Sequence, residues 1–294
     1  MIEKHKGIAI GRLNKNIKII LKKIRPASNP YISGDGFRRI ADHIYDETNQ
    51  TIDPATVKNG DIIFIATQYL GLFFSKALPT LKNRVKLITH NSDLPADKQL
   101  TSCLNDKIEV WFAQNNTYKH PRVIPIPIGL ENRYHFKNGR IIYFNQLRKL
   151  TINKKNKILF GFNVKTNPKE RENALQYAIH SKYMEELGNW PSPRQYLFKL
   201  SNYKFVLAPP GNGLDTHRAW EAMYTRVVPI VKSSVAMRYF QNLGLPIWVI
   251  DDWDDLDRID NNILEEKYVE LENGFKSKEL FMRYWRNRIH NRNL

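Results

Sequence analysis

Cysteine, long apolar runs and acidic residues are all scarce in this chain. The 294 residues include one cysteine, Cys103, which excludes an internal disulfide and a metal site built from cysteines. No stretch is long and apolar enough to cross a bilayer, and the N-terminus has no secretory signal. We therefore expect a soluble, cytoplasmic protein, with peripheral attachment to a membrane as the alternative.

The shortage of acidic residues leaves a large positive charge. Lys and Arg number 46 against 29 Asp and Glu, so the formal net charge is +17. Such a charge favours an anionic partner, which can be a nucleic acid, an acidic lipid surface or an acidic glycan. The basic residues are scattered, and helix-turn-helix, zinc-finger and RNP-type patterns are missing. We expect no nucleic-acid partner, and keep a basic nucleic-acid-binding protein as an alternative.

The apolar pattern predicts an α/β protein of two domains. Hydrophobic residues make up 42% of the chain, enough for sizeable cores, and short apolar strands alternate with helical segments, which indicates parallel sheets. A polar, lysine-rich stretch at 138–156 interrupts the pattern, which restarts at Ile158. We predict an N-terminal domain over 1–150, a second over 151–275, and a C-terminal helix in 276–294 that crosses back to the first domain.

The most informative segment is YKFVLAPPGNGLDTHRAWEAMYTRVVPIV, residues 203–231. It predicts a strand over Tyr203 to Ala208, a glycine loop, a helix capped by Asp215 and running to Tyr224, and a second strand over Val227 to Val231. This order is a βαβ unit with a right-handed crossover. Its loop lies at the carboxyl end of a parallel strand, where open α/β sheets bind ligands.

The loop and the helix start have the chemistry of a diphosphate site. Gly211 and Gly213 let a ligand approach the backbone, and the free amides of the first helical turn favour an anion. Arg218 and Glu221 share a helix face, where a guanidinium suits a diphosphate and a carboxylate suits ribose hydroxyls. The alternative is an ordinary Pro-Gly turn followed by a surface ion pair.

The string FVLAPPGNGLDTHRAWEAM, continuing into VVPIV, resembles the nucleotide-sugar-binding segment of exostosin-like glycosyltransferases, in particular of bacterial and viral relatives. The resemblance implies the GT-B fold, in which two Rossmann-like domains face each other across a cleft and the C-terminal one binds the donor. It implies that Glu221 meets the ribose, and that UDP is the nucleotide. With the preceding strand and loop, the expected donor-binding residues are Lys165, Arg171, Pro210, Gly211, Asn212, Gly213, Asp215, His217, Arg218 and Glu221.

The general base of an inverting transfer should come from the N-terminal domain. Residues 31–47 predict a loop followed by a helix with Ile40, Ala41 and Ile44 on one side. Asp35 in this loop ranks first, because flanking glycines expose its carboxylate. His90 ranks second for its unperturbed pKa, and Asp93 follows in the same post-strand loop. The alternatives are helix caps for both aspartates and a structural role for His90.

Two further features bear on metal and membrane binding. GT-B enzymes do not generally need a metal, so we expect no cofactor and interpret Asp251 and Asp252 as a cap of the next helix. Residues 1–30 predict an amphipathic helix, which either attaches to an anionic membrane or packs as a terminal helix; we favour packing. The predicted reaction is metal-independent transfer of a sugar to a hydroxyl of a glycan or lipid-linked glycan. A noncatalytic nucleotide- or glycan-binding module is the second alternative.

Overall fold

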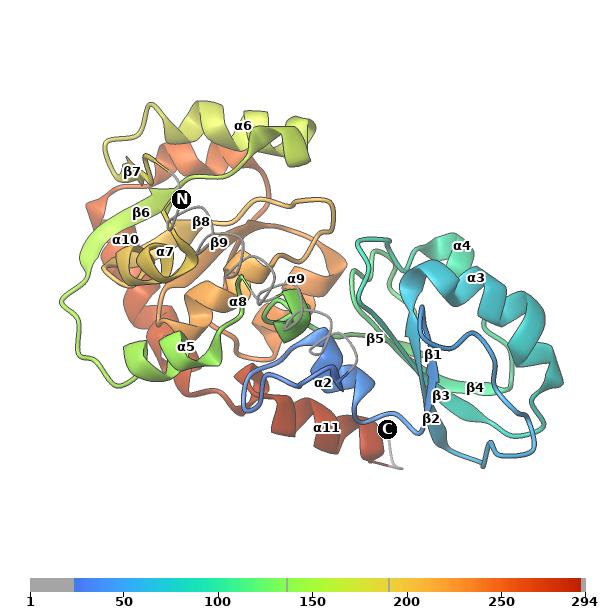
Figure 1. Cartoon of the computed structure of the whole chain (residues 1–294). Coiled ribbons are helices and arrows are strands. Elements are labelled where there is room, and N and C mark those ends of the chain that lie inside the picture. Colours follow the sequence, from blue (N-terminus) through green and yellow to red (C-terminus); the bar gives the residue numbers. More distant parts are fainter. Residues whose placement is uncertain (1–23, 136, 190, 292–294) are drawn as a thin grey trace, which may run out of the picture.

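The computed structural model describes residues 24–135, 137–189 and 191–291, and consists of two five-stranded parallel sheets surrounded by helices (Figure 1). Cavities lined by residues from both halves lie between the sheets. The predicted α/β fold with two Rossmann-like domains facing each other is therefore confirmed. Among the described residues, no helix is both long and apolar enough to span a membrane. Most of the helix predicted for 1–30 lies outside the described residues.

The N-terminal sheet holds its strands in chain order, with every neighbouring pair parallel. Its central strands are almost entirely buried, because apolar residues occupy both faces. The strands are β1 (His43–Tyr45), β2 (Asp61–Ala66), β3 (Val85–His90), β4 (Ile108–Ala113) and β5 (Val123–Pro125).

The prediction of a helix that carries Ile40, Ala41 and Ile44 is wrong. Helix α2 (Gly34–Arg38) starts earlier, at a cap where the Ser33 hydroxyl accepts from the Gly36 amide, and it ends at Arg38. Ile44 then belongs to the edge strand β1, opposite Phe64 of β2. Pairing with a neighbouring strand outweighs the local helical spacing here, as tertiary contacts often do.

The C-terminal sheet has the order β10-β9-β8-β6-β7, so the chain reverses its direction of winding between β6 and β8. Loops on either side of such a switch point diverge and leave a crevice. The loops that follow β6 and β8 are the two that the sequence predicts for donor binding. The strands are β6 (Lys155–Phe160), β7 (Met184–Glu186), β8 (Tyr203–Leu207), β9 (Val228–Lys232) and β10 (Trp248–Ile250).

The predicted βαβ unit is confirmed, with α8 (His217–Tyr224) between the parallel strands β8 and β9. The predicted cap is wrong, because Thr216 and not Asp215 is the N-cap residue. Of the predicted pair, Asp252 does cap the helical turn Trp253–Arg258, through a reciprocal pair of hydrogen bonds with Asp255, whereas the Asp251 carboxylate pairs with Arg238. The other helices of this half are α6 (Pro168–Ala178), α7 (Pro193–Leu200), α9 (Val235–Asn242) and α10 (Asn261–Leu271).

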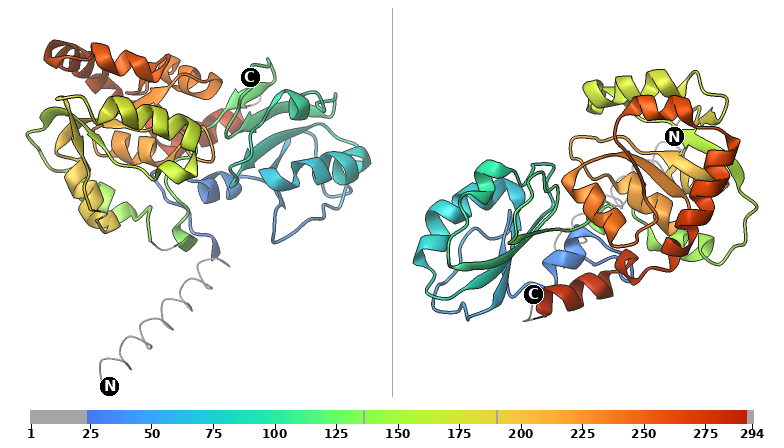
Figure 2. Two further views of the ribbon diagram at one scale, coloured as in Figure 1. Left: turned by 90° about the horizontal axis from the view of Figure 1, so that it is seen from above. Right: turned by 180° about the vertical axis from the view of Figure 1, so that it is seen from behind.

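Two further helices lie where the halves meet. Helix α5 (Ile141–Leu147) contacts α7, and α11 (Met282–His290) contacts α2. Figure 2 shows α11 running from the C-terminal half beneath α2 toward the N-terminal sheet. The Lys86 ammonium of β3 donates to the carbonyl oxygens of Ile289 at 3.1 Å and Asn291 at 2.7 Å. The exact domain boundaries remain a prediction.

Candidate active site

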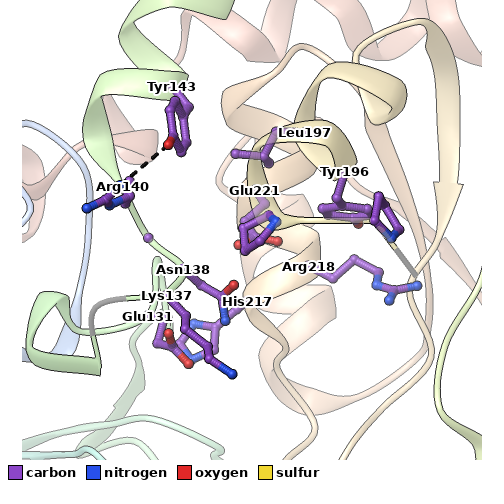
Figure 3. A pocket seen from close by; sticks show the side chains of 13 residues that line it. Glu131, Lys137, Asn138, Arg140, Tyr143, Tyr196, Leu197, His217, Arg218 and Glu221 are labelled. Atoms are coloured by element: carbon purple, nitrogen blue, oxygen red, sulfur yellow. Dashed lines mark hydrogen bonds between the residues drawn. The ribbon is translucent and has the colours of Figure 1, made fainter. Parts of the chain in front are cut away.

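Two neighbouring cavities share Glu131 and His217. The first, about 260 Å³, contains three residues of α8 and is called the α8 cavity (Figure 3). The second, about 190 Å³, contains the residues that follow β3 and is called the β3 cavity. The α8 cavity is lined by Glu131, Lys137, Asn138, Gly139, Arg140, Tyr143, Pro191, Pro193, Tyr196, Leu197, His217, Arg218 and Glu221. The β3 cavity is lined by Gly34, His90, Asn91, Ser92, Asp93, Gln114, Ile128, Leu130, Glu131, Asn132, Tyr134, His135 and His217.

Arg218 and Glu221 both line the α8 cavity, so their predicted common helix face is confirmed. The Arg218 guanidinium lies 5.8 Å from the centre of the Tyr196 ring. Burial raises the pKa of the Glu221 carboxyl to about 7, although Arg218 acts against this. Burial likewise raises the pKa of Tyr196 to about 12. The cavity therefore offers the guanidinium cation of Arg218 beside Glu221 and Tyr196, which can both donate and accept hydrogen bonds.

The glycine loop after β8 is packed against other protein groups. A Cβ atom on Gly211 would lie 3.0 Å from Arg171 Nη2, and one on Gly213 would lie 2.5 Å from Asn115 Nδ2. Arg171 Nε donates to the Pro210 carbonyl at 2.8 Å, and Asn167 Nδ2 donates to the Gly211 carbonyl at 3.0 Å. The two glycines thus accommodate protein side chains, and their predicted role in letting a ligand approach the backbone stays a prediction.

Asp215 and Asn212 connect this loop to the N-terminal half. The buried Asp215 carboxylate accepts from Trp220 Nε1 at 2.9 Å and from the Ile128 amide at 2.7 Å. Asn212 Nδ2 donates to Asp93 Oδ2 at 3.2 Å. Both side chains therefore position the loop in this structure.

Neither Lys165 nor Arg171 lines the α8 cavity. Lys165 is exposed, and its backbone amide donates to Asn163 Oδ1 at 3.1 Å. Arg171 donates to the carbonyl of Asn163 at 2.8 Å besides that of Pro210. Arg171 thereby joins the two loops at the switch point, and a donor role for either residue stays a prediction.

The expected exposure of Asp35 is wrong, because the residue is only 1% exposed. Its carboxylate pairs with Arg25 at 3.2 Å. Burial raises the pKa of this carboxyl despite the guanidinium. The flanking glycines do not lead to exposure, since α2 is packed beneath Asn91 and Asn132, whose side-chain amide groups approach Asp35. A base that accepts a proton from a substrate has to reach it, and burial counts against Asp35.

His90 and Asp93 both line the β3 cavity, with different accessibility. His90 is 2% exposed, its Nδ1 accepts from the Asn91 amide at 2.7 Å, and its Nε2 lies 3.1 Å from the Pro127 carbonyl. Burial lowers the pKa of His90 to about 4. Asp93 is exposed, so among the three predicted base candidates its carboxylate is the accessible one.

Glu131, which the sequence places after a strand but which is not among the predicted site residues, contributes to both cavities. Its Oε2 atom is buried and has no hydrogen-bond partner among the described residues. The signal was its place just after the apolar run VIPIPIGL, at the ligand-binding edge of a parallel sheet. Tyr143 and Tyr196 were also missed, because neither belongs to a post-strand loop.

No family model and no curated protein matches this chain. Several solved structures are similar in chain arrangement, including the following two. One is the spinosyn rhamnosyltransferase SpnG complexed with thymidine diphosphate, at 11% identity over 78% of this chain and 73% of that one, with a TM-score of 0.40. The other is the α,α-trehalose 6-phosphate synthase from Burkholderia multivorans, at 9% identity over 80% of this chain and 70% of that one, with a TM-score of 0.42. Neither assigns a substrate or a residue role here, and the exostosin-like resemblance remains a prediction.

Proposed function

We propose that this protein transfers a sugar from a nucleotide-sugar donor to a hydroxyl group of a glycan or lipid-linked glycan. The observation that supports it best is the pair of cavities that share Glu131 and His217. A transfer between two substrates needs adjacent sites that hold the reacting atoms close together. An α8 cavity for the donor and a β3 cavity for the acceptor meet this need.

The α8 cavity suits a nucleoside diphosphate. Negative charge develops on the diphosphate as the sugar leaves, and positioned cations stabilise that charge. Arg218 and Lys137 line the cavity, and the first-turn amides of α8 add a positive dipole end. Glu221 suits the ribose hydroxyls, while the rings of Tyr143 and Tyr196 suit a nucleobase. UDP is the favoured nucleotide, on the strength of the exostosin-like resemblance.

The β3 cavity suits a sugar that brings many hydroxyl groups. Its lining is rich in uncharged polar side chains, including Asn91, Ser92, Gln114 and Asn132. Such groups donate and accept hydrogen bonds in the pattern that hydroxyls need. We place the acceptor here, with direct displacement and inversion at the anomeric carbon. Peripheral contact with an anionic membrane is supported by the net charge of +17.

The test is a screen of the purified protein against UDP-, GDP-, ADP- and CMP-sugars, read by thermal shift and by donor hydrolysis or transfer. Arg218→Ala and Glu221→Ala should each lower transfer by at least about 100-fold, because each removes a group that holds the donor. Lys169→Ala, an exposed residue of α6, is the matched control and should leave the rate unchanged.

Each remaining outcome has a defined meaning. Wild-type rates in both α8 variants would remove Arg218 and Glu221 from the donor site. Nucleotide binding without turnover on any sugar acceptor would support a noncatalytic module. Retention on immobilised DNA together with no response to any nucleotide sugar would support a nucleic-acid-binding protein.

A further inference from the structure

His217 stands where the two cavities meet. It is the first residue of α8, and its ring lines both the α8 cavity and the β3 cavity. Figure 3 shows the ring beside Glu131 and Asn138, on the side of the cavity away from Tyr143. A group at this junction can contact a donor and an acceptor at the same time.

The contacts of His217 fix which ring nitrogen carries hydrogen. Nδ1 lies 2.7 Å from the carbonyl oxygen of Gly129. Because a carbonyl oxygen only accepts, Nδ1 is the protonated nitrogen of the neutral ring, and Nε2 keeps its lone pair. Within 24–135, 137–189 and 191–291, no residue forms a hydrogen bond with Nε2.

His90, which also lines the β3 cavity, is arranged in the opposite way. Nδ1 of His90 accepts from the Asn91 amide and its Nε2 faces the Pro127 carbonyl, so both nitrogens are occupied by the backbone. Asp35 is buried in an ion pair with Arg25. His217 therefore offers the more available basic nitrogen. The Gly129 carbonyl holds its ring in place, as an orienting group holds the base in other catalytic sites.

The charges around the ring favour a transient cation there. Burial has the largest effect and lowers the pKa of His217, as His135 also does. The Gly129 carbonyl and the carboxylates of Glu131 and Asp93 act to raise it. His90 also interacts electrostatically with His217. The imidazole is consequently neutral at pH 7, and carboxylates are in place to stabilise the charge that proton uptake creates.

We propose that Nε2 of His217 removes the proton from the acceptor hydroxyl. The assignment rests on the proposed function. The acceptor oxygen forms its bond to the anomeric carbon as the bond from that carbon to the diphosphate oxygen breaks. The electron pair of the breaking bond leaves with the nucleoside diphosphate, and the hydroxyl proton moves to Nε2. Nδ1–H stays on the Gly129 carbonyl throughout.

His217→Asn is the sharpest test. The Asn amide can take the place of Nδ1–H and donate to Gly129, but it cannot accept a proton. We expect kcat for transfer to fall about 100- to 10,000-fold while the thermal shift produced by the nucleoside diphosphate is retained. The exposed His180, in the turn that follows α6, provides the matched control, and His180→Asn should keep the wild-type rate.

The pH profile gives a second readout. The wild-type kcat/KM should fall as the pH drops, with an apparent pKa below the ordinary 6.5 of histidine, since burial lowers the pKa of His217. The residual rate of His217→Asn should lack this acidic limb. His217→Gln serves as a second variant in case His217→Asn does not fold. The unfolding temperature of each variant shows whether it is folded.

A folded His217 variant that transfers at the wild-type rate would overturn the assignment and leave the proposed function intact. Full activity of that variant combined with a 100-fold loss in Glu131→Gln would do the same and would point to the carboxylate. Wild-type protein that neither binds a nucleotide nor turns over any nucleotide sugar would overturn both proposals.

Discussion

The two sheets have the same number of parallel strands and differ in how the chain winds through them. The C-terminal sheet reverses its winding between β6 and β8, whereas the N-terminal sheet runs from β1 to β5 without reversal. Right-handed crossovers that always advance in one direction place every connecting helix on the same face. The N-terminal sheet is thereby left with one face that its own crossovers do not cover.

The side chains of the N-terminal strands reflect this asymmetry. Along β2, Ile63 and Ile65 pack with the sheet's own connecting segments, while Ile62 and Phe64 belong to a core that extends into the C-terminal half. That shared core includes Trp285 of α11. The N-terminal sheet is therefore covered on that face by a helix from the other end of the chain, and the two halves share one apolar core.

Removing Trp285 should break this arrangement most strongly. The side chain is fully buried, and its Nε1 donates to the Glu279 carbonyl at 2.9 Å. Trp285→Ala should cost about 3–5 kcal/mol of the free energy of unfolding. Hydrogen exchange should increase in both sheets. Phe73 belongs to a core built from N-terminal residues alone, so Phe73→Ala should increase exchange mainly in the N-terminal sheet. Arg286→Ala, exposed on the same helix, is the control.

Gly213→Ala tests the contact between the loop after β8 and the N-terminal sheet. The new methyl group would overlap Asn115 Nδ2, which would be 2.5 Å away, so we expect a loss of about 1–3 kcal/mol in urea unfolding. Asn115→Ala should relieve part of that loss in the double variant. Gly71→Ala is the matched control, since nothing lies within 4 Å of the added carbon there. Equal stability of the two alanine variants would contradict the packing described.

The neighbouring Asp215 carboxyl should give an effect that is smaller for each pH unit. Burial raises the pKa of the Asp215 carboxyl from 3.8 to about 7. The folded state therefore binds the proton more tightly, and this contribution to stability is lost as the pH rises through that interval. The free energy of unfolding of wild type minus that of Asp215→Asn should fall by roughly 1 kcal/mol per pH unit. A difference that is independent of pH would contradict the shift.

Much of the fold could be predicted, since buried parallel strands leave continuous apolar runs such as those of β2, β3 and β8. The strand containing Ile44 was missed, because its helical spacing is local and its pairing with Phe64 is not. The sequence also could not show that different segments cover the two faces of the N-terminal sheet, because the residues of both faces are apolar whichever element covers them.

In the candidate site, too, local relations could be predicted and contacts between distant segments could not. Arg218 and Glu221 could be placed together because a helix fixes the relation between neighbouring turns. The role of Gly211 and Gly213 could not be judged, since the groups that fill the space beside them come from distant segments. Burial of Asp35 depended likewise on Arg25 and on Asn132, nearly a hundred positions away.

Asn115 gives the crevice between the halves a spectroscopic reporter. Its Oδ1 accepts from the Asp215 amide at 3.2 Å, and its Nδ2 lies 3.4 Å from the carbonyl oxygens of Ser92 and of Asp93. A phosphate that reached the amides near Gly213 would have to displace this carboxamide. The NMR signals of its NH₂ protons would then move on titration, and so distinguish ligand entry at the loop from entry at α8 alone.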